Sequence, residues 1–204
     1  VLGNLYKPLK LFNSFAKSKG NRITILNYHG IPKKDLDNFR LQIEWLHGNY
    51  KLISPQDFHT FLNRKLKIED HAVLISFDDG FESSYKATRD ILDPMEIKAQ
   101  FFLLSDFVGD NNLNSWKGFV TNNIYKSSKI GAQVFDYQKP MSTKEIESLI
   151  NNGHLMGAHT STHPNLCDLS SKDQLEHELF YSKKKLEKDF EISIHSMAYP
   201  FGGI

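Results

Sequence analysis

The architecture of this chain follows from one stretch, Ala72-Val73-Leu74-Ile75-Ser76-Phe77-Asp78-Asp79-Gly80. Its β-branched and aromatic residues predict a fully buried strand, with two aspartates at the carboxyl end. Neighbouring side chains on an extended segment point to opposite sides, so Asp78 and Asp79 are expected to have different roles. Gly80 allows a sharp turn directly afterwards. Taken alone, Asp-Asp-Gly is more often a simple turn, so other motifs must decide between a turn and a site.

The composition is that of an ordinary globular protein. The chain has 204 residues, 40% of them hydrophobic, which suffices for a substantial core in a single domain over residues 1–204. With 25 basic and 24 acidic residues the formal net charge is +1, which gives no electrostatic reason to expect a nucleic acid partner. One cysteine permits no internal disulfide, and no run is long enough for a transmembrane helix.

The N-terminal residues 1–20 predict a helical extension. Within residues 5–19, leucine and phenylalanine recur near helical spacing among several lysines. Such a helix more often packs on its own domain, and peripheral contact with a membrane surface is the alternative. The N-terminus has no secretory signal, so the protein is expected outside the cytoplasm only if an export signal has been removed, and otherwise inside it.

Strands and helices alternate along the rest of the chain. The expected strands cover residues 22–28, 72–77, 99–104, 154–158 and 193–199, and the expected helices cover 37–48, 55–62, 82–92, 143–152 and 171–190. The polar stretch 105–140 predicts an elaborated rim. This alternation predicts an α/β fold with a parallel sheet. The polar motifs follow the carboxyl ends of strands, which is the active face of α/β barrels.

Two histidines follow the fourth expected strand, in the loop His159-Thr160-Ser161-Thr162-His163. Histidines four residues apart are by themselves more often surface or capping residues. A position directly after a buried strand favours metal ligation instead. With an acid from another strand they would form a His, His, Asp set, which leaves a position on a divalent metal for water or substrate.

These two motifs resemble those of the polysaccharide deacetylases, which are also called carbohydrate esterase family 4 or NodB homology domains. The stretch from Ser76 to Gly80 is similar to the family's first motif, and the histidine loop is similar to its second. The resemblance implies that Asp78 is the catalytic base and that Asp79, His159 and His163 bind the metal. It also implies a distorted, incomplete (β/α) barrel. Zn²⁺ is the first expectation for the metal, with Co²⁺, Ni²⁺ or Fe²⁺ as alternatives.

A third motif is suggested by Tyr199-Pro200-Phe201-Gly202. The resemblance implies that the Phe201 backbone N–H holds the oxyanion and that Tyr199 and Pro200 contact the substrate. The family usually has an arginine that orients the base where this chain has Ala198, so that partner is absent. The family's later motifs, with their general-acid histidine, would lie beyond Ile204, so the domain is expected to lack its C-terminal strands.

An early motif, Tyr28-His29-Gly30-Ile31, resembles one in the branch of the family that acts on poly-N-acetylglucosamine in biofilms. In that branch, its histidine takes the place of the late one. A lone histidine at a strand end would more often just satisfy its hydrogen bonds there. The resemblance and the lack of a later candidate favour His29 as the general acid, because the departing amine needs a proton donor.

These observations predict a metal-dependent hydrolase that removes N-acetyl groups from an N-acetylhexosamine-containing glycan and releases acetate. Two alternatives from other classes are a catalytically inactive carbohydrate-binding relative and an assembly partner in polysaccharide export. Acetate release distinguishes the hydrolase from the inactive relative, and metal content distinguishes it from the assembly partner. The glycan, its linkage and the oligomeric state do not follow from the sequence.

Overall fold

The computed structural model describes residues 22–109, 115–126 and 131–202. The predicted extension over residues 1–20, including the helix expected at 5–19, lies outside the described residues. Across the described ranges, none of the helices combines the length and apolar character needed to span a bilayer.

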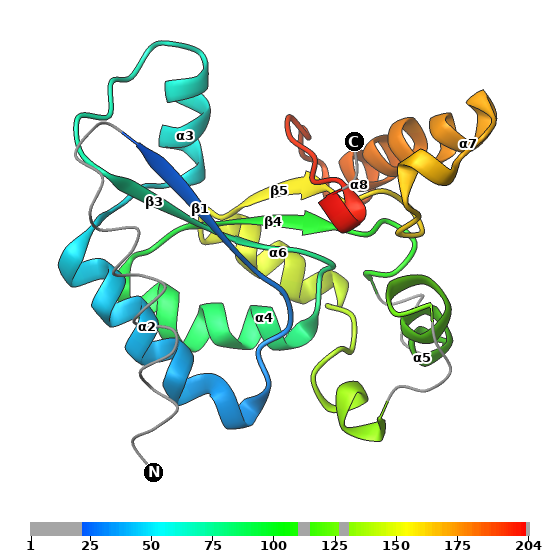
Figure 1. The fold of residues 1–204 in the computed structure, drawn as a ribbon, viewed down its shortest axis with the longest axis horizontal. Helices are drawn as coiled ribbons and strands as arrows, with labels where there is room; N and C mark the ends of the chain where they lie inside the picture. Colours follow the sequence, from blue (N-terminus) through cyan, green and yellow to red (C-terminus); the bar gives the residue numbers. More distant parts are fainter. Residues whose placement is uncertain (1–21, 110–114, 127–130, 203–204) are drawn as a thin grey trace.

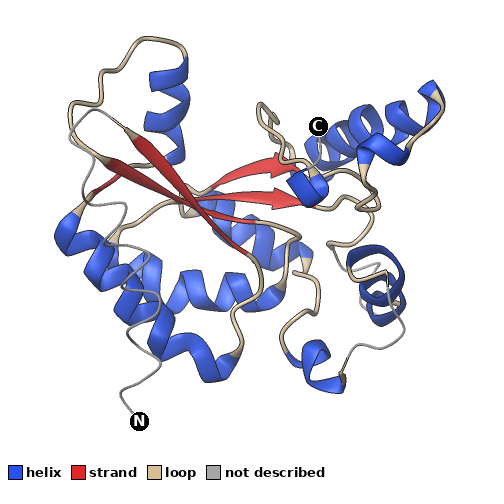
Figure 2. Ribbon diagram, viewed as in Figure 1, coloured by secondary structure: helices blue, strands red, loops and turns tan. Residues whose placement is uncertain are grey.

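A parallel β-sheet forms the centre of the molecule (Figure 1, Figure 2). Its main path runs in the order β1-β3-β4-β5, and the short β2, which the sequence analysis missed, pairs with the beginning of β3. All of these pairings are parallel, so the carboxyl ends of the strands face the same way. The α/β class is therefore confirmed. The strands are β1 (Ile23–Tyr28), β2 (Lys51–Leu52), β3 (Ala72–Phe77), β4 (Ala99–Leu103) and β5 (Leu155–Ala158).

The strand β3 is buried along its whole length, as the sequence predicts. It pairs with β1 on one edge and with β2 and then β4 on the other. A strand covered on both faces carries a continuous apolar run rather than an alternating one. At its carboxyl end, Phe77 stacks on Phe101 of β4 with ring centroids 5.1 Å apart. This packing fixes the position of the turn that follows.

Helices pack around the sheet, and α2, α4 and α6 lie along one side of it in Figure 1. Three helices begin with a capping box, in which Ser54, Ser142 or Ser171 exchanges hydrogen bonds with the residue three positions later. The helices are α2 (Leu36–Asn49), α3 (Pro55–Leu62), α4 (Glu82–Ala87), α5 (Trp116–Phe119), α6 (Thr143–Asn151), α7 (Lys172–Glu176) and α8 (Ser182–Phe190), with π-helical segments at Thr88–Leu92, Val120–Ile124 and His177–Tyr181.

Two expectations about the elements are wrong. The segment 193–199 is no strand, because it joins β5 through a single parallel bridge between Ala158 and Met197. Its backbone hydrogen bonds to β5 both involve Ala158, the last residue of that strand, so pairing cannot continue. The helix expected over 37–48, with Gly48 as its last residue, continues past the glycine, since α2 ends at Asn49. One glycine costs a helix only about 1 kcal/mol, which the packing of α2 offsets.

Candidate active site

The carboxyl ends of the strands border a cavity of about 610 Å³. Loops after β1, β3 and β5 and the segment near the end of the described chain supply its wall. Of the residues singled out from the sequence, Pro200 is buried nearby and does not line the cavity. The others all line it: His29, Asp78, Asp79, His159, His163, Tyr199 and Phe201.

The turn after β3 sends its two carboxylates into different surroundings. Asp79 has a left-handed φ of 71°, and Gly80 follows with a φ of 84°. A Cβ at Gly80 would lie 2.4 Å from Cγ1 of Val108, so the turn requires glycine both for its conformation and for its space. Asp79 joins the two histidines in a cluster of potential metal ligands, and Asp78 stands outside that cluster.

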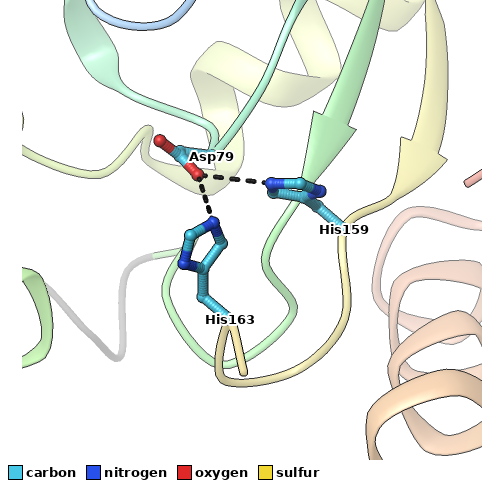
Figure 3. A group of neighbouring side chains, drawn as sticks. All are labelled: Asp79, His159 and His163. Carbon is cyan, nitrogen blue, oxygen red and sulfur yellow. Dashed lines mark ion pairs between the residues drawn. The ribbon is translucent and has the colours of Figure 1, made fainter. Parts of the chain in front are cut away.

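Asp79, His159 and His163 are buried and point toward one another (Figure 3). Asp79 Oδ1 lies 3.5 Å from His159 Nε2 and 3.6 Å from His163 Nε2. These separations are too long for good hydrogen bonds. They match the separation of about 3.4 Å expected between ligand atoms that surround a tetrahedral ion at about 2.1 Å. All three ligand atoms lie within 4.8 Å of one another, so the side chains form a candidate metal site.

Hydrogen bonds on the far side of each imidazole fix its tautomer. His159 Nδ1 lies 2.9 Å from the Ala198 carbonyl oxygen, and His163 Nδ1 lies 3.4 Å from that of Asn123. A carbonyl oxygen only accepts, so each Nδ1 carries the proton and each Nε2 turns its lone pair toward Asp79. Asp79 Oδ1 itself has no hydrogen-bond partner among the described residues. When the Asp79 carboxyl group is ionised, three acceptors thus converge without a donor among the described residues, an arrangement that a cation stabilises.

Burial also shifts the pKa values of this cluster. It raises the pKa of Asp79 to about 8, and the charge of Asp78 adds to the effect. It lowers the pKa of His159 and that of His163 to about 4, so both imidazoles are neutral at pH 7. Two neutral imidazoles and a carboxylate are donors that suit Zn²⁺ and its first-row neighbours. The residues present therefore fit a divalent metal.

The loop that carries both histidines is held by Glu178, which the sequence analysis did not identify. This buried carboxylate accepts hydrogen bonds from the backbone N–H of Ser161 at 2.8 Å and of Thr162 at 2.9 Å, and from the Thr162 hydroxyl at 2.6 Å. The loop includes left-handed φ values of 72° at Thr160 and 63° at His163. Such conformations cost non-glycine residues about 1–3 kcal/mol each, which these hydrogen bonds help to offset.

The two oxygens of Asp78 have different environments. Oδ2 accepts a hydrogen bond of 2.7 Å from Asn27 Nδ2, and the buried Oδ1 has no partner among the described residues. Burial raises the pKa of Asp78, and the Asn27 hydrogen bond and the charges of His29 and His163 act in the opposite direction. His29 is exposed in the cavity directly after β1, and it interacts electrostatically with Asp78.

Aromatic side chains form the rim of the cavity. Tyr199 is 48% exposed and Phe201 is 57% exposed. Phe201 belongs to a turn over Pro200–Gly202, has a left-handed φ of 61°, and packs its ring 4.7 Å from that of His163. The cavity wall also includes four residues from the stretch 105–140 that the sequence analysis did not single out: Ile124, Tyr125, Tyr137 and Gln138. The aromatic and amide side chains among them, within a polar stretch, were the available signal.

The family of this chain is shown by a match that covers more than half of its length. Residues 65–204 match the family model described as polysaccharide deacetylase. The chain belongs to the polysaccharide deacetylase family. The predicted membership of this family is thereby confirmed.

Two relatives show how far this chain can be compared with known proteins. The poly-beta-1,6-N-acetyl-D-glucosamine N-deacetylase of Staphylococcus aureus (strain MSSA476) is 26% identical over 208 residues, which cover 91% of this chain and 67% of the relative. A second relative is YxkH of Bacillus subtilis (strain 168), which is named as a polysaccharide deacetylase. It is 24% identical over 193 residues. That match covers 90% of this chain but only 58% of YxkH.

Solved structures share the fold of this chain. IcaB from Ammonifex degensii superposes with a TM-score of 0.69 at 18% identity, over 89% of this chain and 75% of IcaB. The Streptococcus pyogenes deacetylase PplD, solved in complex with acetate, gives 0.66 at 20% identity, over 91% of this chain and 76% of PplD. At such identities the likeness shows the fold alone, and it agrees with the predicted fold class.

Proposed function

We propose that this protein is a metal-dependent hydrolase that removes N-acetyl groups from N-acetylhexosamine residues of a glycan and releases acetate. One observation carries the proposal. In a single cavity, the Nε2 lone pairs of His159 and His163 point toward the Asp79 carboxyl group. A second carboxylate, Asp78, lines the same cavity and is held by a hydrogen bond from Asn27. The name of the S. aureus relative and the acetate complex of PplD support an N-acetylated glycan as the substrate class.

Asp79, His159 and His163 would hold the metal, with Zn²⁺ as the first expectation and Co²⁺, Ni²⁺ or Fe²⁺ as alternatives. When bound, the ion supplies Lewis acidity toward the acetyl carbonyl and the attacking water. The protein contributes imidazoles that are already neutral at pH 7. Because burial raises the pKa of Asp79 to about 8, metal binding at pH 7 releases the proton of that carboxyl group.

Asp78 is the proposed base. Its Oδ1, which has no hydrogen-bond partner among the described residues, takes a proton from water while the water oxygen bonds to the acetyl carbon. The Phe201 backbone N–H is the proposed donor to the oxyanion that develops on the carbonyl oxygen. His29 then protonates the amide nitrogen, the C–N bond breaks, and acetate and a free amine leave. We place the sugar against the exposed ring of Tyr199 and the turn at Pro200.

The test is acetate release by the metal-loaded protein from β-1,6-linked and β-1,4-linked N-acetylglucosamine oligomers. We expect acetate and free amine in equal amounts from at least one of the two. An oligomer that binds without any release of acetate would instead indicate a catalytically inactive carbohydrate-binding relative.

The role of His29 is tested in the same assay. His29→Ala should keep its fold and metal and should lose turnover by about 100-fold or more, because general acid catalysis contributes on that scale. Wild-type turnover in this variant would show that another group protonates the amine.

A further inference from the structure

The proposed base, Asp78, has no arginine at position 198 to orient it, because this chain has Ala198 there. Ala198 contributes only backbone groups, since its carbonyl oxygen accepts the hydrogen bond from His159 Nδ1. Asp78 is nevertheless held, because Asn27 Nδ2 donates to its Oδ2 at 2.7 Å. This hydrogen bond joins the carboxyl end of β1 to the turn after β3.

The orientation of the Asn27 amide follows from its two neighbours. Ser76 Oγ donates to Asn27 Oδ1 at 3.1 Å, and Asn27 Nδ2 faces Asp78. In the flipped amide, Oδ1 would face the carboxylate of Asp78, and two acceptors would repel each other. A serine hydroxyl can serve either amide orientation, so the carboxylate decides between them.

The backbone register explains why these three side chains meet. Asn27 lies opposite Ser76 in the parallel pair of β1 and β3. Side chains two residues apart on an extended segment share a face, so Ser76 and Asp78 both project toward Asn27. The Asp78 backbone N–H donates to the Tyr28 carbonyl oxygen at 3.0 Å, which keeps the two strand ends together.

We infer that Asn27 is a positioning residue for the base: its amide N–H holds Asp78 Oδ2 and leaves Oδ1 as the oxygen that accepts the proton. The inference rests on the proposed role of Asp78. A carboxylate held at one oxygen cannot rotate freely between productive and unproductive geometries, and such orientation contributes to the rate of the chemical step. Asn27 itself is exposed in the cavity, so its replacement leaves no void in the core.

Two substitutions isolate the donor. Asn27→Asp keeps the shape and removes the N–H group, whereas Asn27→Ala removes the N–H group without adding a charge. A loss shared by both variants is therefore due to the missing donor. We expect kcat for acetate release to fall by about 10- to 100-fold in both, the usual effect of losing an outer-shell partner, with KM and metal content unchanged.

Thr24→Val is the matched control. Thr24 lies on the same strand and its hydroxyl also bonds a side chain, His71, but at a distance from the cavity wall. This variant should keep the wild-type kcat. If both Asn27 variants also keep the wild-type kcat, or if their KM rises while kcat is unchanged, Asn27 does not position the base.

Crystal structures of wild type and Asn27→Ala give a readout that is independent of turnover. We expect the Asp78 carboxylate to rotate or to occupy several orientations once the donor is gone. An unchanged, well-ordered carboxylate would overturn the inference. Failure of the wild type to release acetate would instead count against the proposed function, and the orientation of Asp78 would still report on Asn27.

Discussion

The strand β5 has a histidine at each end, and the two histidines differ in what surrounds them. His154 precedes the strand and His159 follows it, and each is only 2% exposed. Each also lies near an aspartate, at 2.8 Å for His154 and Asp93 and at 3.5 Å for His159 and Asp79. Burial and an aspartate neighbour therefore do not distinguish the two ends.

The hydrogen bonds do distinguish them. The Ala99 backbone N–H donates to His154 Nδ1 at 3.0 Å, so the proton resides on Nε2 and is donated to Asp93. Both nitrogens of His154 are thus satisfied by the protein. His159 has the opposite tautomer, and its Nε2 lone pair faces another acceptor. A buried histidine with an unsatisfied lone pair is a candidate ligand, and a fully bonded one is structural.

Replacing the histidine at each end of β5 by alanine should give the largest difference in metal content between two variants. His159→Ala removes one of the three candidate ligands, and we expect it to lose both metal and acetate release. His154→Ala should keep the wild-type metal content, but leaving the buried Ala99 N–H without its acceptor should reduce the free energy of unfolding by about 1–3 kcal/mol. Elemental analysis and urea unfolding measure the two effects. Equal metal content in both variants would remove the distinction between the two ends.

The next largest effect concerns the carboxylate that stands outside the cluster. Asp78→Asn keeps the shape of the side chain and removes the base, so we expect turnover to fall by about 10²- to 10⁴-fold. The metal should remain, because Asp78 is not one of the three converging ligands. Loss of metal together with activity would show that Asp78, rather than Asp79, is the ligand.

A smaller effect is expected from Glu178→Gln. The substitution replaces one of the two carboxylate oxygens that accept hydrogen bonds from the histidine loop by an amide group, and it removes the negative charge that strengthens the remaining hydrogen bonds. Loss of outer-shell support typically weakens metal binding by about 10- to 100-fold. Glu176→Gln, an exposed site in the same helical stretch, is the matched control and should bind metal like the wild type. Metal titration measures the affinity of both variants. Equal metal affinities in the two would contradict the role of Glu178.

The smallest effect is on the pH dependence of stability. Burial lowers the pKa of His154 below its ordinary value of 6.5, with Lys98 acting in the same direction and Asp93 in the opposite one. Protonation therefore favours the unfolded chain, so the stabilising contribution is complete above about pH 6.5 and decreases as pH falls below it. His154→Gln should show a shallower loss of unfolding free energy between pH 7 and pH 5. Parallel curves for the two proteins would contradict this assignment.

Short-range sequence patterns predicted much of the fold and of the candidate site. The buried run of β3 and the polar residues after β3 and β5 each lie within a few positions, so local reasoning placed them at the carboxyl ends of parallel strands. Helix starts near residues 55, 143 and 171 could be predicted for the same reason, because the serine that caps each helix lies within three residues of its hydrogen-bond partner.

The partners that hold the site could not be predicted in this way. Glu178 reaches the histidine loop from a later helical segment, and Asn27 reaches Asp78 from another strand. Such contacts depend on how elements pack and leave no local pattern. The expected strand 193–199 failed for a related reason, because pairing needs a partner of matching length and β5 ends at Ala158.

The most direct test of the account is the position of a bound metal. Anomalous diffraction from crystals grown with Zn²⁺ should show a peak at about 2.0–2.2 Å from Asp79 Oδ1, His159 Nε2 and His163 Nε2 together. Such a peak would establish that the three converging acceptors form the metal site. Bound zinc that avoids these atoms and lies instead at His154 and Asp93 would contradict the central claim.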